Sequence, residues 1–258
     1  MITAILVYST AFLLSLFFTN FYERVKKTSF IKKSFLSQHY LISRKFDLFI
    51  LFVLSLIPLV FIGAIRVGIG KDYSDYLSSY IYYQAQPFFD SIFHSNEPGM
   101  VFLYKISGYI FLGSDFGFFA LSVFVTVLFV FLSLRYYCNN LSMSFGLYIF
   151  LMLFFIESFN LVAQMISVSI VLFAYKYIIE KKPIKYVLFI ALATAFHLSA
   201  AITIIYLFFI FYSSKKKYVV LEHIFDYLYI ILIVLSPLYI GILFDVAEKI
   251  PLFSSYFQ

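Results

Sequence analysis

The chain of 258 residues contains one cysteine, Cys138, and no tryptophan. A single cysteine excludes an internal disulfide and a metal site built from cysteines. Charged residues are also scarce: they make up 12% of the chain, against about 25% in an average soluble protein. Hydrophobic residues make up 63%, with a mean hydropathy of +0.97. This balance is typical of a multi-pass membrane protein, and we expect a single integral membrane domain over 1–258.

The basic residues are concentrated in a few segments, and 22–46 alone holds seven Lys and Arg. Membrane proteins collect Lys and Arg in cytoplasmic loops, so we expect 22–46 to be a cytoplasmic basic loop. The same rule accounts for the net charge of +6 without nucleic-acid binding. No basic residue precedes the first apolar run. This argues against a cleavable signal sequence and places the N-terminus outside the cytoplasm.

Eight apolar runs lie at roughly 2–21, 47–65, 99–113, 116–134, 142–158, 160–179, 186–212 and 225–244. A helix needs about 20 apolar residues to cross a bilayer, so 99–113 is short and 186–212 is long. Suppose that 99–113 enters the membrane and returns to the same side, and that 186–212 is a hairpin turning near His197. The basic segments between spans then all face the cytoplasm. Cys138 then lies in a cytoplasmic loop. We expect an all-α polytopic membrane helix bundle with about six full spans and two short re-entrant or hairpin elements.

The polar stretch 66–98 then forms an extracytoplasmic loop. It begins with "RVGIGKDYSDY", whose first residue is Arg66. A planar guanidinium suits a phosphate or diphosphate, and the alternative is a solvated span end. Gly68 and Gly70 allow the backbone to approach a ligand closely. The ATP-binding P-loop pattern fails at two of its positions, which excludes that reading.

Two aspartates in this loop, Asp72 and Asp75, are spaced one helical turn apart. Three readings are open for these two carboxylates. One acts as a general base assisted by the other, both bind a divalent metal ion, or both form ion pairs with Lys71 and Arg66. The D-x-D pair that is typical of metal-dependent sugar-nucleotide transferases is absent from the loop. We therefore expect no metal ion.

Further candidates are aromatic or acidic. Tyr73, Tyr76 and Tyr80 share one helix face. Such a stripe packs at the bilayer interface or provides an aromatic floor for a sugar ring. Glu97 precedes Pro98 at a predicted helix start, where a carboxylate either caps the helix or acts in catalysis.

Two polar features lie in the second half of the chain. Asn160, Gln164 and Ser167 recur at i, i+4 and i+7, which makes a polar stripe that either joins helices or lines a sugar pathway. His197 is surrounded by alanines and is either a proton acceptor or a packing residue. The other histidines show no zinc-ligand spacing with it.

Four motifs follow one another along the chain: R-x-G-x-G-x-D-Y-x-x-Y (66–76), E-P-G (97–99), F-N-x-x-x-Q (159–164) and A-x-x-F-H-x-S-A (193–200). In this order they resemble the EpsG-type family of bacterial exopolysaccharide polymerases, which are akin to the Wzy polymerases. The resemblance covers roughly 47–215. It rests on the series of motifs, because no single motif is diagnostic.

The resemblance implies a membrane glycosyltransferase of the bacterial cytoplasmic membrane. Such an enzyme joins oligosaccharide repeat units, carried on undecaprenyl diphosphate, at the outer face of that membrane, with no cofactor. Its expected partners are the lipid-linked oligosaccharide, the lipid bilayer, and the flippase and chain-length regulator of the same pathway. No nucleic acid is involved.

The resemblance also implies roles for individual residues. A diphosphate leaving group needs preorganised positive charge, which Arg66 supplies with Lys71 behind it. The acceptor hydroxyl needs a base, for which Asp72, Glu97 and His197 are candidates. The remaining substrate-binding candidates are Gly68, Gly70, Tyr73, Tyr76, Asn160 and Gln164.

One position departs from the family pattern, because Ala163 stands where relatives commonly have arginine before the glutamine. Three rival functions stay open. The first is a flippase or other transporter for lipid-linked oligosaccharides, although transporters often contain internal repeats and none is evident here. The others are a membrane-bound acyltransferase and a non-catalytic scaffold of a polysaccharide assembly.

Overall fold

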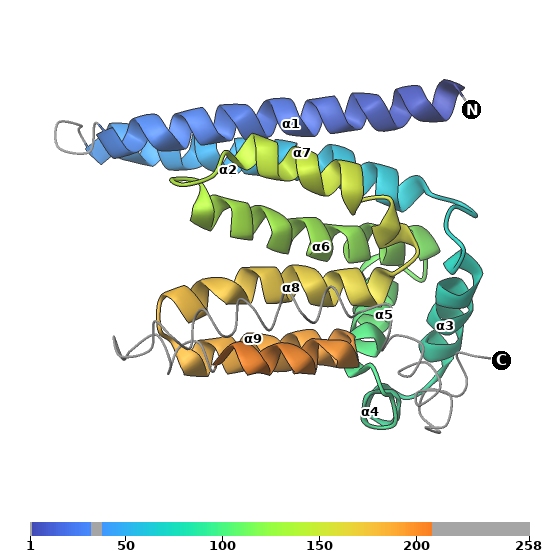
Figure 1. Ribbon diagram of the computed structural model, residues 1–258. Helices are drawn as coiled ribbons and strands as arrows, with labels where there is room; N and C mark the ends of the chain where they lie inside the picture. The colour runs from blue at the N-terminus through green and yellow to red at the C-terminus, as the bar shows by residue number, and fades with distance from the viewer. Residues whose placement is uncertain (1, 32–37, 208–258) are drawn as a thin grey trace, which may run out of the picture. The chain divides into compact units, whose positions relative to one another are not determined.

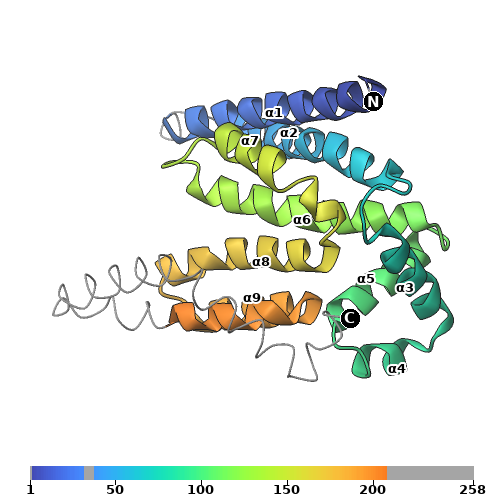
Figure 2. The same cartoon turned by 45° about the vertical axis from the view of Figure 1, so that its right-hand side comes forward.

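The computed structural model describes residues 2–31 and 38–207, with side chains for 4–27 and 44–207. All of these residues belong to one compact unit, Met1–Ile210. They form helices without a strand, as Figures 1 and 2 show. The elements in chain order are α1 (Ile2–Ile31), α2 (Gln38–Ile65), α3 (Tyr73–Ala85), α4 (Phe88–Phe93), α5 (Pro98–Ile110), α6 (Asp115–Tyr137), α7 (Met143–Leu153), the 3₁₀ turn η1 (Glu157–Phe159), α8 (Val162–Ile179), α9 (Pro183–Phe196) and the 3₁₀ segment η2 (Leu198–Tyr206).

Four helices in this part of the chain are long and apolar enough to cross a membrane. Their candidate spans are Ala4–Lys27, Arg44–Ile65, Asp115–Tyr137 and Val162–Ile179. α7 and α9 are also apolar but shorter, with 11 and 14 residues. The expected all-α polytopic membrane bundle is therefore confirmed, while the predicted run 225–244 lies outside the described residues.

The bundle has two ends, seen at the right and left of Figure 1. The polar end holds α3, α4 and α5, and the basic end holds the last turns of α1, the first turns of α2, and the α6–α7 and α8–α9 connections. Contacts far apart in sequence fix both ends. Near the start of α1, the Tyr8 ring lies 6.4 Å from that of Phe159. Near its other end, Lys26 Nζ lies 2.9 Å from Cys138 Sγ.

Charge is divided unequally between the two ends. Ten of the thirteen Lys and Arg residues with described side chains lie at the basic end: Arg24, Lys26, Lys27, Arg44, Lys45, Arg135, Lys176, Lys181, Lys182 and Lys185. Six of the nine described Asp and Glu residues lie at the polar end: Asp72, Asp75, Asp90, Glu97, Asp115 and Glu157. This is the asymmetry that the positive-inside rule would produce across a membrane.

The short run 99–113 forms α5, which begins and ends at the polar end. Its 13 residues measure about 20 Å at 1.5 Å per residue, less than the ~30 Å core of a bilayer. Gly99 lets α5 approach α9, because a Cβ on this residue would lie 2.9 Å from the backbone of Ala195. After Phe111 the chain turns into α6, so α5 does not traverse the bundle.

The long run 186–212 breaks at His197, as its length predicts. α9 ends at Phe196, and His197 adopts an extended conformation with φ −155° and ψ 124°. η2 then turns back along α9, where the Tyr186 hydroxyl donates a 2.6 Å hydrogen bond to the Thr203 carbonyl. The residues after 207 lie outside the described part.

The run 142–158 leads from the basic end to the polar end, as expected of a span, but not as one continuous helix. α7 ends at Leu153 after 11 residues, and a turn and η1 follow it. The N–H groups of Phe154 and Phe155 both donate to the Phe150 carbonyl, at 2.9 and 3.0 Å, which closes the helix. The irregular segment after α7 carries Phe159 to the polar end, where it contributes to the site described below.

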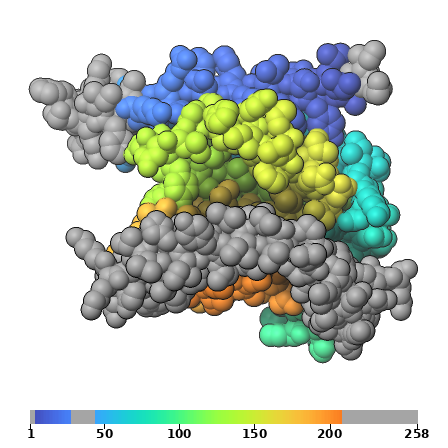
Figure 3. Space-filling model, in the orientation of Figure 1, coloured from blue at the N-terminus to red at the C-terminus, as the bar shows by residue number. Residues whose placement is uncertain are grey.

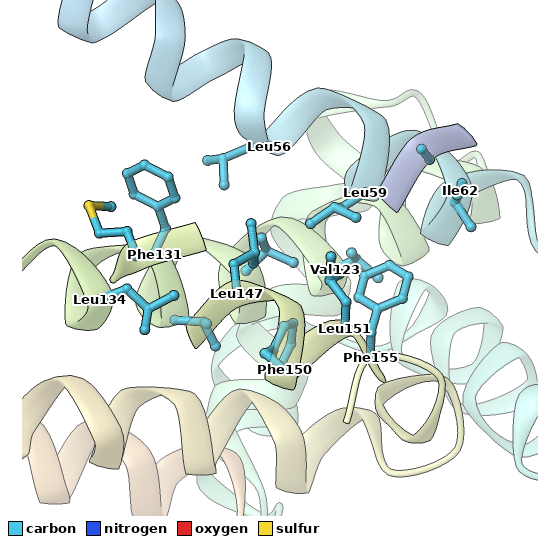
Figure 4. Close-up of a cluster of buried hydrophobic side chains, with 14 of the residues drawn as sticks. Leu56, Leu59, Ile62, Val123, Phe131, Leu134, Leu147, Phe150, Leu151 and Phe155 are labelled. Carbon is cyan, nitrogen blue, oxygen red and sulfur yellow. The ribbon is translucent and has the colours of Figure 1, made fainter. Parts of the chain in front are cut away.

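Apolar side chains hold these helices together. Figure 4 shows one buried cluster, in which α2, α6, α7 and the turn after α7 contribute Leu56, Leu59, Ile62, Val123, Phe131, Leu134, Leu147, Phe150, Leu151 and Phe155. The outer surface is also apolar. α1 and α7 lie side by side on the face shown in Figure 3, and their exposed side chains include Leu13, Phe17 and Phe145. A surface of this kind suits contact with lipid.

Candidate functional site at the polar end

Arg66 directly follows the last residue of α2 and is 1% exposed. Its guanidinium carbon lies 4.6 Å from the ring centre of Phe119 and 4.5 Å from that of Phe159. None of its three side-chain nitrogens has a hydrogen-bond partner among the described residues. Burial lowers the pKa of Arg66 to about 10, so it remains charged at pH 7. Two cation–π contacts, worth about 0.5–2 kcal/mol each, offset only part of the cost of burying a cation. Arg66 is therefore a candidate anion-binding group.

The loop after Arg66 is fixed against the turn between η1 and α8. Gly68 and Gly70 have positive φ angles of 64° and 111°. A Cβ on Gly70 would lie 3.0 Å from the Phe159 carbonyl oxygen, whereas one on Gly68 would meet nothing. The Lys71 N–H donates a 2.7 Å hydrogen bond to Asn160 Oδ1. Gly70 and Asn160 thus position the loop, while the Lys71 side chain is exposed.

The tyrosine stripe of α3 packs inward on α6 and α8. Tyr73 stacks on Phe119 with ring centres 4.8 Å apart, and Tyr80 stacks on Phe118 at 5.6 Å. The Tyr76 hydroxyl accepts a 3.4 Å hydrogen bond from the backbone N–H of α8's second residue. Burial raises the pKa of Tyr76. The stripe therefore serves mainly to hold α3 on the bundle, and Tyr73 stacks on Phe119, one of the two rings that contact Arg66.

Glu97 and His197 form a direct pair although 100 residues separate them. Glu97 Oε1 lies 2.7 Å from His197 Nδ1, and the two side chains are 37% and 29% exposed. Glu97 occupies the N-cap position of α5 but makes no side-chain capping bond. The contact between Gly99 and α9 brings the two residues together. With Nδ1 occupied, Nε2 is the nitrogen left to accept a proton.

Tyr76 lies within electrostatic range of Glu97, of Asp72 and of Arg66. All four predicted catalytic residues, Arg66, Asp72, Glu97 and His197, therefore gather at the polar end. Within the described residues, no three His, Cys, Asp or Glu side chains could hold a metal ion together.

A family model for the EpsG family matches residues 49–258. The chain belongs to the EpsG family. No curated protein and no solved structure matches it. The four segments that resemble EpsG proteins, 66–76, 97–99, 159–164 and 193–200, all meet at the polar end.

Other candidates are less well placed. Asp75 is exposed, Gln164 is half-buried on α8, and Ser167 is buried. Lys105, a further cation in this part of the chain, donates to the carbonyls of Gln84 and Gln86, so its charge supports the end of α3.

Two phenylalanines of this EpsG protein, Phe119 and Phe159, flank Arg66. Phe159 begins the F-N-x-x-x-Q motif but was given no role from the sequence, and Phe119 was missed because no spacing distinguishes it among 36 phenylalanines. Ala163, the position at which the resemblance implied an arginine, is 4% exposed and packs in the cluster that contains Phe119. An arginine at this position would need space that the packed cluster does not provide.

Proposed function

We propose that the protein is a polysaccharide polymerase that joins lipid-diphosphate-linked oligosaccharide repeat units at the outer face of the bacterial cytoplasmic membrane. EpsG membership supports a polymerase-like role. One observation carries the proposal: the same end of the bundle holds two features. They are the buried Arg66 guanidinium, which has no polar partner among the described residues, and the Glu97–His197 pair. This combination suits transfer from a diphosphate to a hydroxyl.

Each group has a distinct part in the proposed reaction. His197 Nε2 accepts the proton of the acceptor sugar hydroxyl, while Glu97 holds the imidazole and stabilises its charge. The acceptor oxygen forms a bond to the anomeric carbon of the donor. The bond from that carbon to the diphosphate oxygen breaks, and undecaprenyl diphosphate leaves with the electron pair. Arg66 stabilises the negative charge that develops on the leaving group.

Access to Arg66 requires movement of the chain around it, because Arg66 is 1% exposed. The loop that follows supplies the means. Gly68 is in a positive-φ conformation with open space around it, and Val67 is 79% exposed. In this proposal, displacement of the loop admits the diphosphate to the guanidinium. Asp72, which follows the loop, is the alternative base.

The charge asymmetry supports an orientation with the basic end in the cytoplasm and the polar end and N-terminus outside. Cys138 was expected to lie in a cytoplasmic loop between spans, where a thiol reagent could label it. It is 1% exposed and in contact with Lys26 Nζ, so it is unsuited to a labelling test.

Two exposed asparagines provide a better test of this orientation, Asn96 at the polar end and Asn140 at the basic end. In a Cys138→Ala background, we expect a membrane-impermeant maleimide to label Asn96→Cys in intact cells. It should label Asn140→Cys only after permeabilisation. The background protein alone should stay unlabelled. Labelling with the opposite pattern would reverse the orientation and place the site in the cytoplasm.

Deletion of the gene, followed by analysis of lipid-linked sugars, tests the reaction itself. We expect single repeat units to accumulate on their lipid carrier at the outer face, because units still arrive there but are not joined. Accumulation at the inner face would indicate a flippase instead. Polymer of normal length and amount would exclude a polymerase role for this chain.

A further inference from the structure

A cavity of about 290 Å³ lies at the basic end, between α1, α2 and α6. Three polar side chains line it, one from each helix: Tyr22, Lys45 and Arg135. The rest of its wall is apolar and is formed by Leu48, Phe49, Phe52 and Leu132. The cavity is at the opposite end of the bundle from the proposed catalytic site, and that function does not use it.

Tyr22 is the buried member of this set. It is 2% exposed, and its ring packs edge-on against Phe131 with ring centres 5.1 Å apart. Its hydroxyl lies within electrostatic range of the Arg135 guanidinium. Because Tyr22 lines the cavity, its O–H is a donor suited to a ligand there.

The polar lining consists of donors and cations. A phenol, an ammonium and a guanidinium face the cavity, and no carboxylate is among the residues that line it. Of the nearby acids, Glu23 binds Lys27 and the first N–H groups of α7, and Asp47 is exposed outside the lining. Lys26 Nζ donates to the Arg135 carbonyl at 2.6 Å and adds a further positive charge.

We propose that this cavity binds an anionic phospholipid of the leaflet at the basic end. The phosphate lies between Tyr22, Lys45 and Arg135, which are the donors that a phosphate ester prefers. The acyl chain follows the apolar wall that starts at Leu48. A free phosphate would match only the polar side of the cavity. A lipid with an uncharged head would match only the apolar side. The bound lipid joins three helices that enclose the cavity.

The test is a lipid titration of the purified full-length protein in detergent, with thermal unfolding and native mass spectrometry as readouts. We expect phosphatidylglycerol to bind and to raise the unfolding midpoint, whereas phosphatidylcholine and inorganic phosphate do not. Tyr22→Phe, which removes only the hydroxyl, should weaken binding about threefold to tenfold. Lys45→Gln and Arg135→Gln should each weaken it by about tenfold or more.

The matched controls are Lys182→Gln and Lys185→Gln, which remove charge at the same end without touching the cavity. They should bind phosphatidylglycerol as the wild type does. An equal loss in these controls would show diffuse attraction to the basic end and overturn the site. Equal stabilisation by phosphatidylcholine or by inorganic phosphate would also overturn it, as would unchanged binding by Tyr22→Phe. Since no readout depends on polymer formation, the result is independent of the proposed enzymatic function.

Discussion

Replacing Arg66 by lysine should lower polymer formation about a hundredfold while leaving the amount of protein in the membrane unchanged. Lysine keeps the positive charge. It loses the planar fork that binds a diphosphate with paired hydrogen bonds, and it fills the space between Phe119 and Phe159 poorly. Polymer amount and chain length in a deletion strain complemented with each variant provide the measurement.

The matched control for this substitution is Arg24→Lys, which makes the same exchange at the basic end. It should support polymer of wild-type length and amount. If Arg66→Lys supports the same polymer as this control, then Arg66 is a structural cation held by two aromatic rings, and the diphosphate is bound elsewhere. If Arg66→Lys lowers polymer only because less protein reaches the membrane, quantification of the protein will show that directly.

Much of the helical framework can be predicted from the distribution of apolar residues. The run lengths identify 99–113 as too short to cross and place a break at His197, and α5 and the end of α9 agree with both. The helix end at Leu153 could not be read in this way, because the residues on both sides of it are equally apolar. That end is set by hydrogen bonds from the N–H groups of Phe154 and Phe155 to the Phe150 carbonyl. Such bonds depend on backbone geometry rather than on hydropathy.

The site was predictable as a set of residues but not as an arrangement. Polar side chains are rare in this chain, so Arg66, Glu97 and His197 could each be recognised individually as candidate site residues. Nothing local in the sequence shows that Glu97 reaches His197, because the contact depends on the close approach of Gly99 to α9. For the same reason, the sequence left the choice of base open. Our proposal takes His197 as the base, because Glu97 holds its Nδ1 at 2.7 Å and leaves Nε2 to accept the proton.

The second large effect concerns this pair. His197→Ala should lower the rate of polymerisation by about 10² to 10⁴, the usual contribution of a general base. Glu97→Gln keeps an oxygen that can hold His197 Nδ1 but removes the negative charge that stabilises the imidazolium. We therefore expect an intermediate loss, in kcat rather than KM, because the charge matters when the proton is transferred. The measurement is the rate of chain extension of lipid-linked units by purified protein, at saturating and at limiting substrate and across a range of pH.

The pH profile separates catalysis from packing. In the wild type the rate should fall on acidification, because a protonated imidazole cannot accept the proton of the acceptor hydroxyl. The residual rate of His197→Ala should lack this dependence. His94→Gln is the matched control, since His94 is an exposed histidine at the same end that contacts only its own helix turn, and it should keep the wild-type rate and profile. Suppose instead that His197→Ala keeps the acid dependence of the wild type, or that Glu97→Gln is as inactive as His197→Ala and unfolds more easily. Then the pair is a structural clamp between α5 and α9, and Asp72 becomes the residue to test as the base.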